Sequence, residues 1–285
     1  MKTQRWIIFA SITLGFSLST SSAMADRSAC SGLPGQAALR SALQAAVANP
    51  GNGGLGFNMW ATVVAKDGTV CAVAFSGNQF TDQWLGSRVI SAQKASTANY
   101  FSLGEGSNMP AVSKFPNGLA LSTANLYSAV QPGGSLYGLQ HSNPVDATEA
   151  YKGPAILFGQ PTDLLVGERI GGINVFGGGL VLLATGGIRV GGLGVSGDTS
   201  CTDHMVAWRV RAALGLDHFG PAATAVGGVS GDPARPDNII FDIAPAANGG
   251  LLDPVGTLSQ SAGGFGHPTC LFNPDPSTLP AVMHP

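Results

Sequence analysis

The side chains that could do chemistry gather where Cys201, Asp203 and His204 follow a glycine-rich stretch. Thiolate, carboxylate and imidazole groups are all zinc ligands, so a metal site is the first hypothesis to consider. Three residues at such close spacing do not converge on one face of a helix. We therefore interpret them as a disulfide cysteine, an acid that stabilises a helix N-terminus, and a surface histidine.

The segment GLGVSG at 192–197 fits the glycine pattern of a dinucleotide-binding loop, and Asp217 follows at about the distance of a ribose-binding acid. That acid should end a second parallel strand, but Asp217 directly follows a predicted helix and its terminal glycine. Ser196 is similar to the serine of a nucleophile elbow, yet that motif needs a glycine where Asp198 stands. These glycines indicate close backbone approach or turns instead.

Four cysteines, Cys30, Cys71, Cys201 and Cys270, all follow an N-terminal segment typical of a secretory signal. That segment, 1–25, combines two basic residues, an apolar centre and an Ala-Met-Ala cleavage site. An even number of cysteines in an oxidising compartment favours disulfides. Of three pairings, the chain order favours Cys30 with Cys71 and Cys201 with Cys270. We predict an exported protein, periplasmic or secreted.

The composition bears on the partners of the mature chain. Without the signal, 12 basic residues stand against 16 acidic ones, a net charge of −4, which argues against nucleic acid as a partner. Charged residues make up 11% of the chain against a usual value of about 25%, which predicts that part of the surface is buried in a homo-oligomer. No later segment is apolar over roughly 20 residues without many glycines, so no membrane span is expected after signal cleavage.

Hydrophobic patterning predicts the elements that position these groups. Helices are predicted at 36–49, 84–101 and about 202–214. Thr202 or a neighbouring polar residue can cap the last of them, and Gly215 stands at its C-terminal stop.

Strands are predicted by β-rich runs bounded by turn residues. They are expected at 59–65, 69–76, 173–176, 180–184, 188–196 and, as an edge strand, 238–243. An Asp-Gly pair between the first two indicates an antiparallel hairpin. Between the second predicted helix and the later strands, the segment 103–143 is rich in Gly, Pro and Asn, and a short helix is expected within it at 122–130. We predict that this segment shapes ligand access or a subunit contact and adds no strand to the central sheet.

Two blocks of this sequence resemble the GlcG/HbpS haem-binding family. The run SAQKASTA at 91–98 is similar to the family helix with its Lys-Ala-x-Thr-Ala motif. The block 176–209 is similar to the family's glycine-rich hairpin, its Gly-Val-Ser-Gly turn and its last helix, where Asp203 takes the acidic place. The resemblance implies an α/β (α+β) fold, with a central antiparallel sheet of about five strands covered by helices.

The resemblance also implies a division of the chain and leaves some parts outside it. A GlcG/HbpS-like domain is expected at 26–216, with an insertion at about 103–172, and a C-terminal extension at 217–285 is expected to pack on the same domain. The arginine that usually ends the family's first hairpin is missing, since Ser76 lies in its place. A ligand contact by that arginine is therefore not expected.

Non-covalent haem is the cofactor that the resemblance implies, in a pocket between the second helix, the glycine turn and the last helix. Covalent attachment is not supported, because the sequence has no C-x-x-C-H motif. Basic residues near the motifs would hold propionates, and loop His and Tyr residues, Tyr151 among them, are candidate iron ligands. The candidate ligand contacts are Lys94, Arg88, Arg189, Gly177, Gly178, Tyr137, His141 and His204.

Three functions follow from these observations. The first is an extracytoplasmic binding protein for haem or a related small ligand, acting as a sensor or scavenging partner. The second is an enzyme acting on a small organic acid or aromatic catabolite, which is disfavoured because the motifs assemble no nucleophile with its base. The third is a structural homo-oligomer without a ligand. The sequence favours the binding protein over the enzyme.

Overall fold

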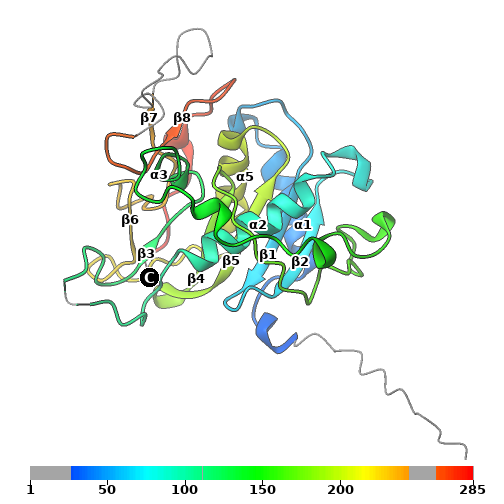
Figure 1. Cartoon of the computed structure of the whole chain (residues 1–285), viewed down its shortest axis with the longest axis horizontal. Helices are drawn as coiled ribbons and strands as arrows, with labels where there is room; N and C mark the ends of the chain where they lie inside the picture. Colours follow the sequence, from blue (N-terminus) through cyan, green and yellow to red (C-terminus); the bar gives the residue numbers. More distant parts are fainter. Residues whose placement is uncertain (1–26, 111, 244–260, 285) are drawn as a thin grey trace, which may run out of the picture.

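A four-stranded antiparallel sheet lies at the centre of the protein (Figure 1). The computed structural model describes residues 27–110, 112–243 and 261–284. The strands lie in the spatial order β2-β1-β5-β4, with bounds β1 (Trp60–Ala65), β2 (Val70–Phe75), β4 (Gly179–Ala184) and β5 (Ile188–Ser196). Two hairpins, β1–β2 and β4–β5, therefore join through β1 and β5, which pair from Trp60 with Ser196 onwards.

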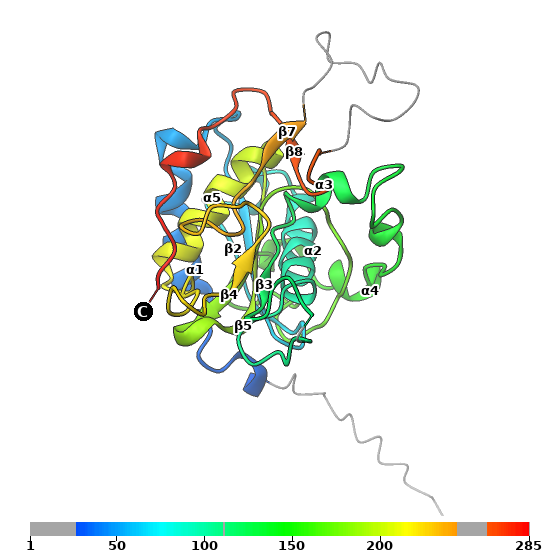
Figure 2. The same cartoon turned by 90° about the vertical axis from the view of Figure 1, so that its left-hand side faces the viewer.

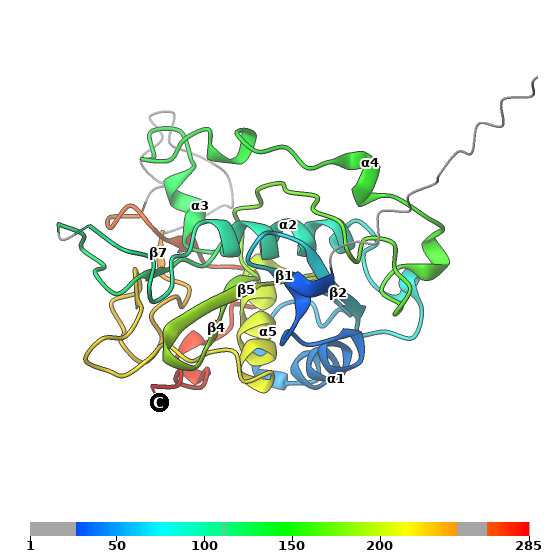
Figure 3. The same cartoon turned by 90° about the horizontal axis from the view of Figure 1, so that it is seen from below.

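Helices cover both faces of the sheet, so the domain has three layers (Figure 3). The three long helices are α1 (Gln36–Val47), α2 (Ser87–Tyr100) and α5 (Ser200–Ala213). Because strand side chains alternate, Ala61 and Val63 pack in the core with α1 and α5, whereas Trp60 and Val64 pack on the side of α2. Leu39 and Leu43 supply the apolar stripe of α1.

Helix α2 lies unusually close to strand β5, because glycines face small residues there. A Cβ atom at Gly194 would lie 1.9 Å from the carbonyl oxygen of Ser91, and one at Gly192 would lie 2.2 Å from that of Ala95. The Ser91 hydroxyl also hydrogen-bonds that of Thr62 on β1 at 2.7 Å. This contact fixes α2, and with it Lys94, against the sheet.

The insertion wraps the outer side of α2. Its regular elements are short: β3 (Leu119–Ala120), α3 (Leu126–Ala129) and α4 (Ala147–Ala150). Strand β3 pairs in parallel with β6 (Gly227–Gly228), outside the central sheet, which confirms that 103–143 adds no central strand. Further on, Phe158, Leu165 and Ile170 are buried on the α2 side of the sheet.

The C-terminal extension packs along α5 (Figure 2). Strand β7 (Phe241–Ile243) pairs in parallel with β8 (His267–Pro268), and Leu279 and Val282 enter the core beside α1 and α5. Arg211 of α5 forms a fully buried, two-pronged ion pair with Asp237, at 2.6 and 2.9 Å. The extension therefore completes the core next to α5.

Several predictions can be compared directly with this architecture. The fold class and both disulfides, Cys30–Cys71 and Cys201–Cys270, are confirmed. The helix cap is Thr199, a neighbour of Thr202, and its side chain accepts a hydrogen bond from the Thr202 N–H. Short 3-10 turns connect the elements, at Arg27–Cys30, Pro50–Asn52, Phe80–Asp82, Leu139–His141, Ala155–Leu157, Thr185–Gly187 and Pro276–Thr278.

Two strand predictions were wrong. The run 173–176 forms no strand, so the sheet has four strands where about five were expected. Its backbone bonds to α2 instead: the Asn174 N–H donates to the Thr97 hydroxyl at 2.9 Å. The run 238–243 is not an edge of the central sheet, because its last three residues pair with β8.

The predicted signal segment, 1–25, lies outside the described residues. In the part of the chain that the structure does describe, no helix has the length and apolar character needed to cross a membrane.

Candidate functional site

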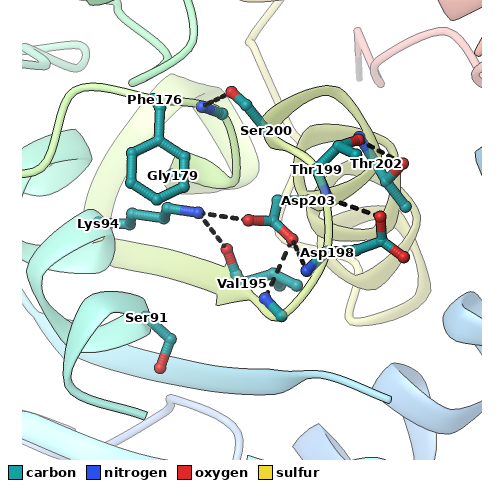
Figure 4. A network of polar contacts seen from close by, with 12 residues as sticks. Ser91, Lys94, Phe176, Gly179, Val195, Asp198, Thr199, Ser200, Thr202 and Asp203 are labelled. Carbon is teal, nitrogen blue, oxygen red and sulfur yellow. Dashed lines mark hydrogen bonds and ion pairs between the residues drawn. The ribbon is translucent and has the colours of Figure 1, made fainter. Parts of the chain in front are cut away.

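Lys94 and Asp203 form a fully buried ion pair between α2 and α5 (Figure 4). The Lys94 Nζ atom lies 2.6 Å from Asp203 Oδ2 and also donates a hydrogen bond to the carbonyl oxygen of Val195 at 3.1 Å. Both side chains are 0% exposed, so neither charged group is in contact with solvent. The pair joins the two sequence blocks that carry the family resemblance.

Asp203 also organises the turn between β5 and α5. Its Oδ1 atom accepts hydrogen bonds from the N–H groups of Gly197 and Asp198, at 3.1 and 2.9 Å. The Asp198 carboxylate in turn accepts from the N–H groups of Leu55 and Phe57, in the loop that precedes β1. The acidic residue predicted to open the last helix is therefore buried, and its carboxylate binds both Lys94 and the backbone of the turn between β5 and α5.

Burial dominates the electrostatics of the ion pair. Desolvation lowers the pKa of Lys94 to about 8, although Asp203 acts to raise it. Desolvation likewise raises the pKa of Asp203 to about 6, although Lys94 acts to lower it. Burial therefore brings the two pKa values closer together, because it penalises the charged form of each group.

The predicted glycine turn lies directly over the ion pair. The ring of Phe176 lies 3.8 Å from Lys94 Nζ, a cation–π contact (Figure 4). Gly178 has a φ of +112°, and a Cβ atom there would meet the Val195 carbonyl oxygen at 2.2 Å. Gly177 donates its N–H to the Ser200 hydroxyl at 2.6 Å. The structure thus brings Lys94, Gly177 and Gly178 together, as expected for one site.

A serine–histidine pair lies at the outer side of this turn. The Ser200 Oγ atom, on the first residue of α5, is 2.6 Å from His267 Nε2 on β8. His267 Nδ1 lies 2.6 Å from the Pro268 carbonyl oxygen. Because a carbonyl oxygen only accepts, Nδ1 carries the ring proton and Nε2 accepts from the hydroxyl.

The environment of His267 keeps its ring neutral. Burial lowers the pKa of His267 to about 4, and the positive charge of Lys94 acts in the same direction. Two aromatic rings flank the imidazole: Tyr127 with a centroid distance of 5.1 Å, and Phe241 at 6.5 Å. We define the cluster of Phe176, Gly177, Ser200, Tyr127, Phe241 and His267 as the turn–helix surface; His267 and Gly177 are buried in it, and the other four residues are partly exposed.

Sequence reasoning did not select Ser200 or His267 as site residues. They are 67 residues apart, and His267 lies in the extension, beyond the blocks of family resemblance. One signal was available: the disulfide predicted between Cys201 and Cys270 brings the neighbours of both residues together. His267 lies three residues before Cys270, just as His204 lies three residues after Cys201.

The two candidate arginines lie elsewhere and hold the fold. Arg88 is buried in a two-pronged ion pair with Asp163 of the insertion, with its guanidinium 3.8 Å from the centre of the Phe158 ring. Arg189 stands at the opposite end of β5 from the site, and its Nη1 donates to the backbone carbonyl of Asn99 at 2.7 Å. The structure therefore does not bring these two candidate ligand contacts together with Lys94.

The candidate iron ligands from the sequence are also dispersed. His204 is fully buried, not on the surface as expected: its Nε2 lies 3.2 Å from Asn238 Oδ1, and burial lowers its pKa to about 4. Tyr137, His141 and Tyr151 are exposed on the insertion. The structure therefore does not gather these four with Lys94.

Cys201, His267 and Cys270 form the one group of potential metal ligands found among the described residues. Their ligand atoms lie within 4.8 Å of one another, but both sulfurs are joined in a disulfide. A disulfide sulfur is not a thiolate and does not bind a metal ion in this form. The metal site that we rejected at Cys201, Asp203 and His204 is not assembled either, since Asp203 and His204 bond to different partners.

We compared this protein with known proteins, and two solved structures with a similar fold are described here. Models of known protein families and the curated proteins give no match to this sequence. One structural neighbour is a crystal structure of a PduOC:heme complex, with a TM-score of 0.39, 22% identity, and coverage of 62% of this chain and 89% of that one. Another is the Klebsiella pneumoniae protein ORFY, described as DUF336, with a TM-score of 0.38, 24% identity, and coverage of 63% and 88%. At these values the likeness carries no functional argument.

Proposed function

We propose that this protein is an extracytoplasmic binding protein for haem or a related flat small molecule, which it holds at the turn–helix surface. The observation that carries the proposal is the state of His267. Its ring is neutral, its Nδ1–H is held by a backbone carbonyl, and aromatic rings flank it. A neutral imidazole anchored through its other nitrogen is the usual form of a histidine that ligates iron.

The residues present at the turn–helix surface fit haem in part. His267 Nε2 offers a lone pair once the Ser200 hydroxyl turns away, and Tyr127 and Phe241 offer apolar faces. Lys94 does not reach a propionate in this arrangement, because it is buried and paired with Asp203. We therefore assign iron ligation to His267 and give Lys94 the role of fixing the turn beneath the ligand.

Two features support the extracytoplasmic location. The sequence begins with a segment typical of a secretory signal, and all four cysteines are paired. Disulfides persist in the periplasm or outside the cell and are rare in reducing compartments.

Titration of the purified mature protein with haemin tests the proposed function. We expect a Soret shift that saturates at one haem per chain. His267→Ala should weaken haem binding by at least about tenfold, the range seen when groups that support a bound metal are lost. The matched control is His141→Ala, which removes an exposed histidine of the insertion.

The outcome against the proposal is equally clear. If wild-type protein shows no saturable Soret shift, the protein is not a haem binder. If His141→Ala weakens binding while His267→Ala does not, the turn–helix surface is not the site. Circular dichroism of each variant shows that the comparison is made on folded protein.

A further inference from the structure

We propose that Ser200 and His267 also act as a nucleophile and general base, which gives the protein an esterase activity toward small carboxylic esters. The motifs in the sequence assemble no such pair, whereas the fold places Ser200 Oγ 2.6 Å from His267 Nε2. That distance is within the range expected of an activated serine and its base. This activity does not depend on the binding of haem.

The hydrogen bonds around the pair all run in the direction that activation requires. Gly177 N–H donates to Ser200 Oγ, so the hydroxyl proton is free to point at His267 Nε2. The Pro268 carbonyl oxygen accepts from Nδ1–H and holds the ring in the tautomer whose Nε2 lone pair is free. The carbonyl thus takes the orienting place that a carboxylate has in a full triad.

The position of the serine suits an attack on a carbonyl group. Ser200 is partly exposed while His267 is buried, so the serine is the member of the pair that a small substrate can approach. Ser200 is the first residue of a 14-residue helix, whose positive end stabilises the negative charge that develops on oxygen. The rings of Tyr127 and Phe176 border the site, so short acyl or aryl esters fit its chemistry.

The reaction balances with water as the only co-reactant. Ser200 Oγ bonds to the ester carbonyl carbon as its proton passes to His267 Nε2, and the carbon–oxygen bond to the alcohol breaks as the alcohol takes that proton. Water then attacks the acyl group on Ser200 and gives a proton to Nε2. The acid leaves, and Ser200 Oγ recovers the proton.

The activity should be slow. The imidazolium that forms in each step has no carboxylate partner, and the charge of Lys94 opposes it. Loss of the carboxylate function from a full triad costs about 10⁴-fold in turnover. Covalent labelling of the serine is therefore a more sensitive readout than turnover.

The experiment treats oxidised mature protein with a fluorophosphonate probe and locates the label by peptide mass spectrometry. We expect the label on Ser200, with none in Ser200→Ala and at least 100-fold slower labelling in His267→Gln. The matched control, Ser142→Ala, removes an exposed serine of the insertion and should label as the wild type does. Hydrolysis of p-nitrophenyl acetate should follow the same order among the variants.

Three results would overturn the esterase assignment: a wild-type protein that resists the probe, a label on another residue, or equal labelling rates in wild type and His267→Gln. The site of the label in wild-type protein decides the matter even if a variant fails to fold. The two functions have separate readouts in the wild-type protein, since the label reports on Ser200 and the Soret shift reports on bound haem. If the wild-type protein is labelled on Ser200 but shows no Soret shift with haemin, haem binding is refuted and the esterase proposal is kept.

Discussion

Replacement of Lys94 by methionine should expose how much the buried ion pair contributes to the fold. Methionine fills a similar volume, but the Asp203 carboxylate then keeps only the N–H groups of Gly197 and Asp198 as partners. Both members of the pair are 0% exposed, so solvent cannot reach the carboxylate that is left. Breaking such a pair typically costs about 3–5 kcal/mol of unfolding free energy.

The pH dependence of this loss identifies its cause. Without the lysine, the pKa of Asp203 rises further above the value of about 6 that burial already gives it. The folded variant then holds a proton that the unfolded chain releases, so its stability falls as pH rises toward the folded pKa. We therefore expect the deficit relative to wild type at the same pH to be large at pH 7 and much smaller at pH 5.

Urea unfolding followed by tryptophan fluorescence measures this difference. The double variant Lys94→Met/Asp203→Leu should recover most of the lost stability, because it leaves no buried charge. Lys152→Met is the control, since Lys152 pairs with Glu149 and Glu168 at the surface. Equal deficits at pH 5 and pH 7, or a double variant no better than the single one, would refute the reasoning.

Three further predictions concern the frame of the site. Gly194→Ala should destabilise the fold by roughly 1–3 kcal/mol or more in urea unfolding, because its methyl group meets the Ser91 carbonyl oxygen. Replacing Cys30 and Cys71 by serine should cost about 2–4 kcal/mol without changing haem or probe reactivity. His204 is neutral in the fold, with a pKa of about 4, so the free energy of unfolding should fall by on the order of 3 kcal/mol between pH 6.5 and pH 4. His204→Asn should make the free energy of unfolding less dependent on pH in this range.

The local signals in the sequence were sufficient for the main elements. The Asp-Gly turn places β1 and β2 in a hairpin, since Asp67 accepts a hydrogen bond from the Thr69 N–H and Gly68 adopts a φ of +87°. The strand predicted at 173–176 is absent from the structure. A short apolar run indicates that its residues are buried, but it does not indicate which element they pack against. Here that element is α2, to which the run bonds through Thr97.

The site was predictable only where it coincides with local motifs. Lys94 and the glycine turn could be selected from sequence because each lies in a recognisable block. His267 belongs to the extension, and its partnership with Ser200 depends on how two distant segments dock. The burial of His204 was missed for the same reason, since Asn238, its hydrogen-bonding partner, comes from the extension.

The Cys201–Cys270 bridge makes the chain from α5 to β8 a covalently closed ring. A protease that cuts any one bond within this ring opens it but releases no peptide, because the two pieces stay joined through the sulfurs. The Arg211–Asp237 pair holds the ring against α5 from within. At the extracytoplasmic location proposed above, where proteases are present, this ring would keep His267 beside Ser200 after a single cut.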